Sequence, residues 1–288
     1  MLSDYTFLKS KKNITLGTII CIPGLAHTKE HFLKTSDGGG WAVNLSDIGF
    51  DVYAINWHSL ATESNKGIFN SMFVVDALFD FIEHKIKKDV CLLTHSASGV
   101  FGWKLAEKSA LVKKIIAIAP APPGNIQDVP EYTVSDNGKT VSVFHLNAVP
   151  YTFSREKNWI ADMSWIKEKA IGKNNPHFPE EFLNEYQESL VSVPSELMYE
   201  RMNINGAQIK VNTVKIKEHN PKIYIFTGDQ DISHSHDRDK RINDFFVKNG
   251  VDSKFFWLAD YGFVGNGHMM MLQKNSQEII DFVISRVN

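Results

Sequence analysis

Cysteines and long hydrophobic runs are scarce in this sequence, and each shortage excludes a class of protein. Only two of the 288 residues are cysteines, Cys21 and Cys91, and both lie in apolar, strand-like segments. So small a number excludes a disulfide-stapled scaffold. We expect reduced core thiols, although a disulfide stays open because neighbouring parallel strands would bring the two close.

The sequence also contains no segment typical of a membrane span or of an export signal. No stretch approaches the ~20 apolar residues of a membrane span. The N-terminal segment lacks the basic start and apolar core of a secretory signal. We therefore expect a cytoplasmic protein without a membrane span.

An excess of charge of one sign is absent as well. The sequence has 31 Lys and Arg against 33 Asp and Glu, a formal net charge of −2. This balance gives no electrostatic reason to expect a nucleic-acid partner, and "KIKK" at 85–88 is expected to be a solvated helix end. Neither a G-x-G-x-x-G segment nor a Walker loop follows a predicted strand, so a nucleotide-binding protein is disfavoured. No cofactor is expected.

Short apolar runs alternate with longer amphipathic segments along the chain. Continuous apolar runs favour strands that are covered on both faces, as in a parallel sheet. These runs are "TIICIP" (18–23), "DVYAIN" (51–56), "DVCLLT" (89–94), "KIIAIA" (114–119), "KIYIFT" (222–227) and "KFFWLA" (254–259). Helical patterns cover 68–86, 97–109, 237–249 and 273–286. The alternation predicts a doubly wound α/β fold with a mostly parallel sheet, and "YTFLKS" with "NITLG" is a candidate leading antiparallel pair.

The alternation stops between residues 121 and 219. This segment contains a predicted hairpin, "YTVSDNGKTVSVF", and aromatic-rich helical pieces, "FSREKNWIADMSWIKEKA" and "FPEEFLNEYQESL". Because an irregular loop of this length is uncommon inside a compact domain, we predict a largely helical cap at 121–219. It is inserted into an α/β core formed by 1–120 and 220–288.

The segment "LLTHSASGV" places Ser96 between a predicted strand and a predicted helix. This is the context of the nucleophile elbow G-x-S-x-G, in which a tight turn exposes the serine hydroxyl. Thr94 and Ser98 replace the two glycines; Ser98 is small, whereas Thr94 adds a branched side chain. Taken alone, Ser96 is either a nucleophile or a serine that caps a helix, which is a common role. Its place before the next two segments favours the nucleophile.

A histidine and an acid follow in the chain order Ser…Asp/Glu…His of such enzymes. His268 lies in the glycine-rich segment "GFVGNGHMMM" before the last predicted helix. "GDQD" follows the strand "KIYIFT" and offers Asp231 as the first candidate for the acid and Asp229 as the second. The methionines after His268 are expected to pack beneath the loop.

The rest of the acid-bearing segment, "DISHSHDRD", has simpler explanations. Asp237 and Asp239 are expected in the first turn of a helix, where they complement its dipole. His234 and His236 alternate with acids but match no strong zinc signature. No metal site is predicted.

Backbone N–H groups are also needed to hold a tetrahedral oxyanion. Our candidates are Ala97, at the start of the helix, and Leu25, which follows the strand end "IPG". An aromatic-rich cap predicts a substrate with an apolar body. For any one of these aromatic side chains, however, packing between the cap and the core is the favoured role. The side chains predicted to contact the substrate are His27, His95, Phe153, Trp159 and Met198.

The ordered set "IPGLAHT", "THSASGVFG", "TGDQD" and "GNGHMMMLQKNSQEI" resembles the α/β-hydrolase superfamily over essentially the whole chain. It is similar to a bacterial serine esterase-like branch with a GNGHMMM-type C-terminal histidine motif. The segment "GGGWAVNLSDIGFDVYAINW" also resembles the corresponding segment of that branch. The resemblance implies a Ser-His-acid hydrolase with a cap over the pocket. Some members of the branch place the acid in an "EP" sequence, where this chain has Ala119-Pro120. That leaves Asp231 as the acid, or leaves none.

The sequence thus predicts a serine hydrolase that cleaves a carboxylic ester or related acyl bond of a small, partly apolar substrate. Ser96, His268 and Asp231 form the expected triad, acting through an acyl-enzyme. One alternative is acyl transfer, thioester cleavage or cyclisation by the same serine. Another is a non-catalytic ligand-binding relative, to which Thr94, Ser98 and Ala119 point. A dehalogenase is disfavoured because the elbow carries serine, and a homodimer is one open outcome for the oligomeric state.

Overall fold

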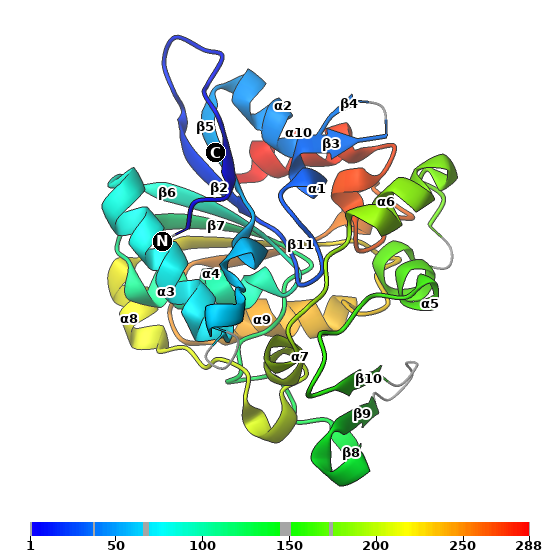
Figure 1. The fold of residues 1–288 in the computed structure, drawn as a ribbon. Helices are drawn as coiled ribbons and strands as arrows, with labels where there is room; N and C mark the ends of the chain where they lie inside the picture. Colours follow the sequence, from blue (N-terminus) through cyan, green and yellow to red (C-terminus); the bar gives the residue numbers. More distant parts are fainter. Residues whose placement is uncertain (1, 37, 66–68, 145–150, 173–174, 288) are drawn as a thin grey trace.

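A seven-stranded sheet in the order β1-β5-β2-β6-β7-β11-β12 forms the centre of the molecule (Figure 1). The computed structural model describes residues 2–36, 38–65, 69–144, 151–172 and 175–287. The strands are β1 (Tyr5–Leu8), β2 (Gly17–Ile22), β5 (Phe50–Ile55), β6 (Val90–His95), β7 (Val112–Ile118), β11 (Lys222–Thr227) and β12 (Ser253–Trp257). Every neighbouring pair is parallel except β1 with β5. The predicted α/β fold with a mostly parallel sheet is confirmed.

The predicted leading antiparallel pair is wrong. β1 pairs with β5, in the register Tyr5↔Ile55, and residues 9–16 contain no strand. The Tyr5 ring packs against the rings of Tyr53 and Phe81, with centroids 5.7 and 5.1 Å away. Ile14, by contrast, is 82% exposed. The N-terminal strand therefore joins the sheet edge where its aromatic ring is buried, and the "NITLG" segment has no such gain.

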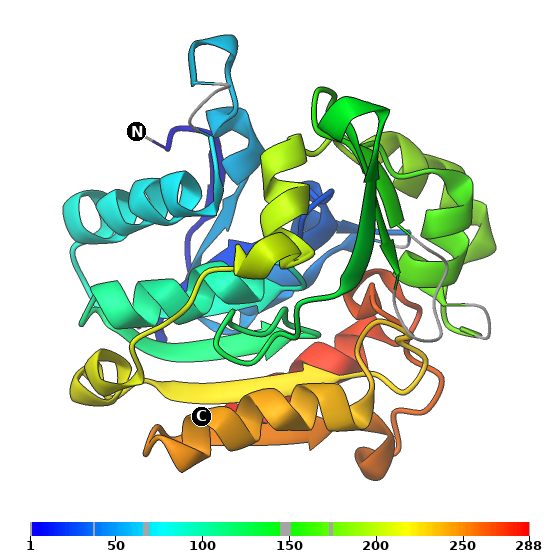
Figure 2. The same cartoon turned by 90° about the horizontal axis from the view of Figure 1, so that it is seen from below.

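Helices cover both faces of the sheet, as Figure 2 shows from below. Successive strand residues alternate between the two cores: Ile20 and Ile22 lie in one hydrophobic cluster, and Ile19 and Cys21 lie in the other. The helices on the Ile20 side are α3 (Ser71–Asp80) with its π-helical continuation η3 (Phe81–Ile86), α4 (Ser98–Lys108), α8 (Thr213–His219) and α9 (His236–Lys248). Those on the Cys21 side are α1 (Glu30–Leu33), α2 (Trp41–Ile48) and α10 (Ser276–Val287). This double covering is why the strands are apolar without interruption.

Both cysteines are free. They lie on adjacent strands out of register, since Cys91 pairs with Ile19 and Cys21 with Leu93. Burial raises the pKa of both thiols, that of Cys91 to about 12, so they are protonated core groups. In the part of the chain that the structure describes, no helix is long and apolar enough to cross a membrane.

The segment between β7 and β11, for which we predict a cap, folds over one end of the sheet. The hairpin of β8 (Glu131–Ser135) and β9 (Thr140–Phe144) is confirmed. However, β10 (Tyr151–Ser154) extends it to three antiparallel strands. The helical piece predicted from Phe153 is therefore wrong at its start: Phe153 pairs with Val141 in this small sheet. The short helices of the segment are α5 (Met163–Trp165), η5 (Ile166–Ile171), η6 (Glu180–Phe182), α6 (Leu183–Ser189), α7 (Ser195–Arg201) and η7 (Ile204–Gly206).

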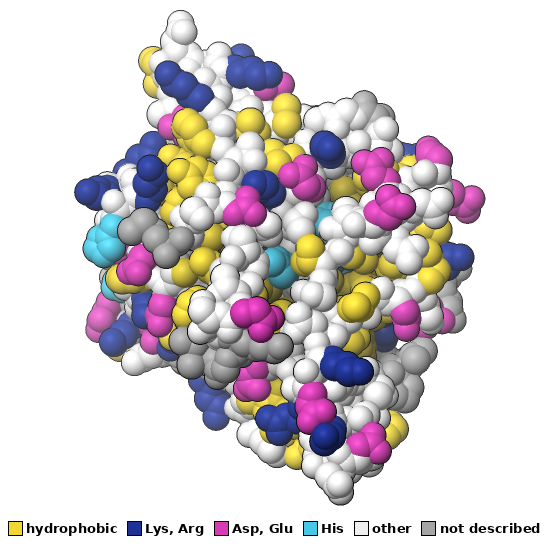
Figure 3. All heavy atoms as spheres, in the orientation of Figure 1, with side chains coloured by type: hydrophobic (Ala, Val, Ile, Leu, Met, Phe, Trp, Pro, Cys, Tyr) yellow, Lys and Arg dark blue, Asp and Glu magenta, His cyan; other side chains and the backbone are white. Residues whose placement is uncertain are grey.

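The C-terminal part of the predicted cap range lies on the core. His219, the last residue of α8, contacts α4 through its Nδ1, which is 2.9 Å from the carbonyl oxygen of Ala106. The domain limits at 121 and 219 stay a prediction. The remaining elements are short: β3 (Lys34–Thr35), β4 (Gly38–Gly39), η1 (Trp57–Leu60), η2 (Glu63–Asn65), η4 (Asp136–Gly138), η8 (Leu258–Tyr261) and η9 (Met270–Leu272). On the face drawn in Figure 3, Lys and Arg side chains are interspersed with Asp and Glu.

Candidate active site

Ser96 forms a tight turn between β6 and α4. Its φ of +55° lies in the left-handed region, which costs free energy for a residue with a side chain. The turn is held by hydrogen bonds: the Ser96 N–H donates to the Ile118 carbonyl (2.9 Å), and the Ser96 carbonyl accepts from the N–H of Ala121 (2.8 Å). No side-chain hydrogen bond caps α4, so Ser96 does not have the capping role. A strained serine between strand and helix is the geometry of the nucleophile elbow.

The Thr94 side chain fits because α4 has a glycine, Gly102, opposite it. A Cβ built on Gly102 of α4 would lie 2.9 Å from Thr94 Cγ2, a distance that real side chains essentially never show. Glycine at 102 therefore supplies the space that glycine supplies at position 94 in the usual motif. The Thr94 side chain is fully buried and is not among the residues that line the adjacent pocket.

Ser98 ties the ends of two strands together. Its Oγ lies 2.7 Å from the Ile22 carbonyl oxygen and accepts from the His95 N–H (2.9 Å). β2 and β6 end here, so the hydroxyl stabilises the floor beneath Ser96. A glycine at position 98 would not make these bonds.

His268 and Asp231 meet at the edge of the sheet. His268 Nδ1 lies 2.5 Å from Asp231 Oδ2, and both residues are buried. Burial alone would raise the pKa of the Asp231 carboxyl, but the neighbouring His268 and His234 and the hydrogen bond from the Ser233 N–H lower it below its usual range. The ionised carboxylate therefore fixes the proton of His268 on Nδ1 and leaves Nε2 as the acceptor.

Asp229 has a different task from Asp231. Its Oδ1 accepts from the backbone N–H groups of Gly265 (2.7 Å) and Asn266 (3.1 Å). A Cβ on Gly228 would lie 2.2 Å from the Asn266 carbonyl oxygen, so the two loops touch backbone to backbone. Asp229 holds the loop that carries His268, whereas Asp231 contacts its imidazole. The three methionines after His268 are fully buried beneath the loop.

A second histidine–aspartate pair lies beside the first. The His234 ring stacks on the His268 ring, with centroids 5.2 Å apart. His234 Nδ1 lies 3.1 Å from Asp239 Oδ1, and Asp239 also accepts from the Thr227 hydroxyl (2.6 Å). Asp237 and Asp239 both lie in the first turn of α9, as predicted. The burial of Asp239 and its pairing with His234 were not foreseen, because sequence spacing does not show which face of a first turn is covered.

Ligand atoms of Asp231, His234 and His268 all lie within 4.8 Å of one another. These residue types can bind a transition metal. Here, though, His268 and His234 each direct Nδ1 at a carboxylate, in pairs that need no ion. The site is accounted for by these two hydrogen-bonded pairs.

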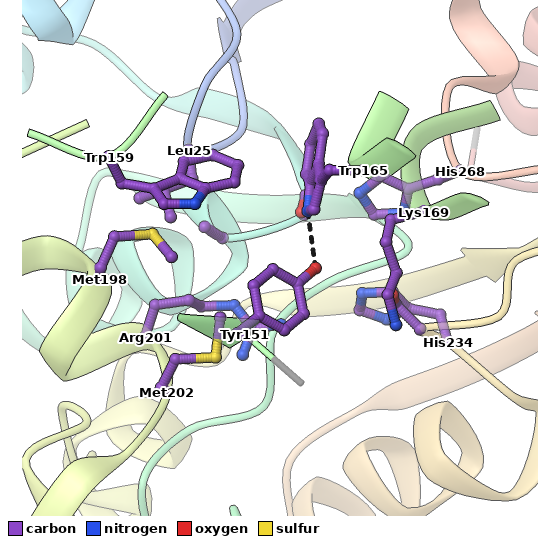
Figure 4. Close-up of a pocket in the computed structure, with 13 residues that line it drawn as sticks. Leu25, Tyr151, Trp159, Trp165, Lys169, Met198, Arg201, Met202, His234 and His268 are labelled. Carbon is purple, nitrogen blue, oxygen red and sulfur yellow. Dashed lines mark hydrogen bonds between the residues drawn. The ribbon is translucent and has the colours of Figure 1, made fainter. Parts of the chain in front are cut away.

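Ser96 and His268 line one pocket, with a cavity volume of about 60 Å³ (Figure 4). Among the described residues, no hydrogen bond joins their side chains, although such a bond commonly tightens only when substrate binds. Leu25 and Ala97 line the same pocket, and in the described structure neither backbone N–H has a hydrogen-bond acceptor. A Cβ on Gly24 would lie 3.0 Å from Ser96 Cβ. The Leu25 loop therefore approaches the serine as closely as the backbone allows.

The predicted substrate contacts are divided between the pocket and the interior. Trp159 and Met198 line the pocket. His27 is buried with its Nε2 2.8 Å from the Tyr186 hydroxyl, and His95 is buried with its Nε2 3.1 Å from the His268 carbonyl. Phe153 lies in the core cluster under the cap. The structure thus places His27, His95 and Phe153 outside the pocket lining.

Several pocket residues were not found from the sequence. They are Tyr151, Lys169, Met202, Arg201, Ser233 and His234. Most come from the cap, where periodicity predicts that a helix forms but not which of its faces meets the core. Trp165 Nε1 donates to the Tyr151 hydroxyl at 2.6 Å, the dashed line in Figure 4.

The mostly parallel sheet with helices on both faces is an α/β-hydrolase fold. Solved structures, esterases among them, share it. The methylesterase MES16 from Arabidopsis is 14% identical with a TM-score of 0.62, covering 94% of this chain and 98% of that one. MenH from S. aureus is 12% identical with a TM-score of 0.63, covering 98% and 96%. Identities this low show the fold alone.

Sequence comparison finds a remote relative. No protein-family model matches the chain. A protein described as a probable secreted lipase, phiG, from a fungal species (strain ATCC 74256), is 26% identical over 201 residues, which is 67% of this chain. The match covers only 44% of that lipase's length.

Proposed function

We propose that this protein is a serine hydrolase that cleaves a carboxylic ester. The observation that carries the proposal is the hydrogen-bonded Asp231–His268 pair, whose histidine lines the same pocket as the strained Ser96. The esterase neighbours and the lipase relative support a carboxylic ester hydrolase-like enzyme. A cytoplasmic location stays a prediction, since that relative is described as secreted.

In the proposed mechanism, Ser96 Oγ attacks the ester carbonyl while His268 Nε2 takes its proton. Asp231 accepts the His268 Nδ1–H and stabilises the imidazolium. The N–H groups of Leu25 and Ala97 donate to the oxyanion of the tetrahedral intermediate. His268 then protonates the leaving alcohol, and a water molecule, activated by the same imidazole, hydrolyses the acyl-enzyme.

Two features support the predicted oxyanion donors and partly apolar substrate. His58 Nε2 lies 2.5 Å from the Leu25 carbonyl oxygen, which fixes the orientation of the loop that presents the Leu25 N–H. Trp159, Met198 and Met202 give the pocket an apolar wall. A short acyl or alkyl segment would be desolvated against that wall.

The test is covalent labelling together with turnover. A fluorophosphonate probe is expected to label wild type at Ser96, and short p-nitrophenyl esters are expected to be hydrolysed with a burst. Ser96→Ala should abolish labelling, and both Ser96→Ala and His268→Ala should lower kcat by at least ~10³. Ser285→Ala, which changes an exposed serine of α10, should leave both readouts unchanged. Wild-type protein that is neither labelled nor active would contradict the proposal and favour the non-catalytic relative.

A further inference from the structure

Two cationic side chains from the cap line the same pocket as Ser96. Lys169 lies on η5 and is only 7% exposed, and Arg201 is the last residue of α7 and half-buried. In Figure 4 they come from different elements and lie on opposite sides of Tyr151. Lys169 Nζ lies 5.4 Å from the centre of the Tyr151 ring. Both cations therefore line the pocket beside Tyr151.

Neither cation is paired. In the described part of the chain, no carboxylate forms an ion pair with Lys169 or Arg201, and neither cationic group donates a hydrogen bond. The negative charges of Glu168 and Asp231 act on Lys169, and those of Asp239 and Asp231 act on Arg201. Asp231 is hydrogen-bonded to His268, and Asp239 is hydrogen-bonded to Thr227 and His234. None of the described residues that line the pocket is Asp or Glu.

Keeping unpaired cations out of water is unfavourable, and the pKa values reflect this cost. Burial lowers the pKa of Lys169. Burial, together with the positive charge of Arg238, lowers the pKa of Arg201 to about 10. Arg201 therefore stays protonated at neutral pH without a compensating anion. Buried charges in proteins are normally paired, so the missing partner is expected in a ligand.

We propose that Lys169 and Arg201 bind a carboxylate of the substrate, so that the preferred substrate is an ester that carries a second, ionised carboxylate. This proposal rests on the proposed ester hydrolysis. The planar guanidinium of Arg201 binds a carboxylate through two hydrogen bonds, and the ammonium of Lys169 adds a point charge. Met198, Met202 and Trp159 contact the methylene chain that separates the two ends of such a molecule.

The proposal is tested with monomethyl esters of succinate, glutarate and adipate, each compared with its neutral dimethyl ester. At pH 7.5, wild type should have a kcat/KM at least ~10-fold higher for one of the monoesters than for its diester. Arg201→Met and Lys169→Met should each lower that ratio by ~10- to 100-fold, mainly through KM. Added salt should weaken only the monoester reaction.

Three variants serve as controls. Lys167→Met removes a charge from an exposed residue of η5 and should leave the ratio unchanged. Arg201→Lys keeps the charge but loses the two-pronged geometry, so its ratio should lie between those of wild type and Arg201→Met. Because the proposed role is ligand binding, Arg201→Met and Lys169→Met should not lower Tm; a structural role predicts that they do.

Binding without turnover separates this proposal from the proposed hydrolysis. Glutarate and its homologues are titrated calorimetrically into Ser96→Ala, with and without Arg201→Met. Binding that the second substitution abolishes supports the anion site even if wild type hydrolyses no ester. A different result would overturn the anion site and leave ester hydrolysis in place. In that case active wild type turns over monoester and diester equally, and Arg201→Met and Lys169→Met do not change the ratio.

Discussion

Asp229 and Asp231 lie two positions apart on one loop, and their carboxylates bind different groups. The Asp231 carboxylate meets His268 Nδ1, and the Asp229 carboxylate meets the N–H groups of Gly265 and Asn266. One orients the imidazole, and the other orients the loop that carries it. The predicted first choice for the acid therefore has the geometry expected of it, and its role stays a proposal.

Substituting the two aspartates in turn tests this division. Asp231→Asn should lower kcat by ~10⁴, because the amide favours the wrong tautomer of the histidine, as in serine proteases. Asp229→Asn retains one acceptor oxygen for the loop N–H groups and should cost no more than ~10-fold. Ester hydrolysis by the two purified variants under identical conditions gives the comparison. A larger loss in Asp229→Asn would move the acid to that residue.

At the scale of elements, the elbow is a contact between β6 and α4. Thr94 on the strand and Gly102 on the helix compensate each other, and Gly99 does the same against Pro120, whose Cβ would lie 2.6 Å from a Cβ on residue 99. The spacing of the usual motif places the small residues beside the serine. Here the strand position two residues before the serine carries Thr94, and the glycine that leaves room for it is Gly102 on the helix.

Gly102→Ala should therefore destabilise the protein, by about 1–3 kcal/mol, which is typical of overpacking a close contact. In a Thr94→Ala background, which lacks the clashing Cγ2, the same substitution should cost much less. Urea unfolding of the two single variants and the double variant completes a double-mutant cycle. Additive effects would show that Thr94 and Gly102 do not compensate each other.

At the scale of the whole molecule, several histidines in and around the loop that follows β2 are uncharged at neutral pH. Burial lowers the pKa of His31 and of His58 to about 4, and it lowers those of His27 and His95 well below their usual value. In the unfolded chain the same groups take up protons near pH 6.5. Between about pH 4 and 6.5 the unfolded state thus binds more protons than the folded state, so stability is complete above this range and is lost as the pH falls.

Each such histidine should contribute a slope of roughly 1.4 kcal/mol per pH unit to the free energy of unfolding below pH 6.5. Urea unfolding between pH 5 and 7.5 measures the slope. His31→Gln and His58→Gln should each make it shallower by about that amount. His84→Gln, at a histidine whose side chain is 66% exposed, should leave it unchanged; equal slopes in all four proteins would refute the assignment.

The sequence by itself determined the parallel strands of the central sheet, and hence the fold, and the order of Ser96, Asp231 and His268 along the chain. Strand periodicity and turn residues act over a few neighbouring positions. Only the tertiary structure decided how β1 pairs, which aspartate meets His268, how Thr94 fits, and which cap residues face the pocket. These outcomes depend on contacts of a few ångströms between segments that are distant along the chain. Lys169 and Arg201 are the clearest case: each looks like an ordinary surface cation in its own helix, and only the fold brings both, without partners, to the pocket that holds Ser96.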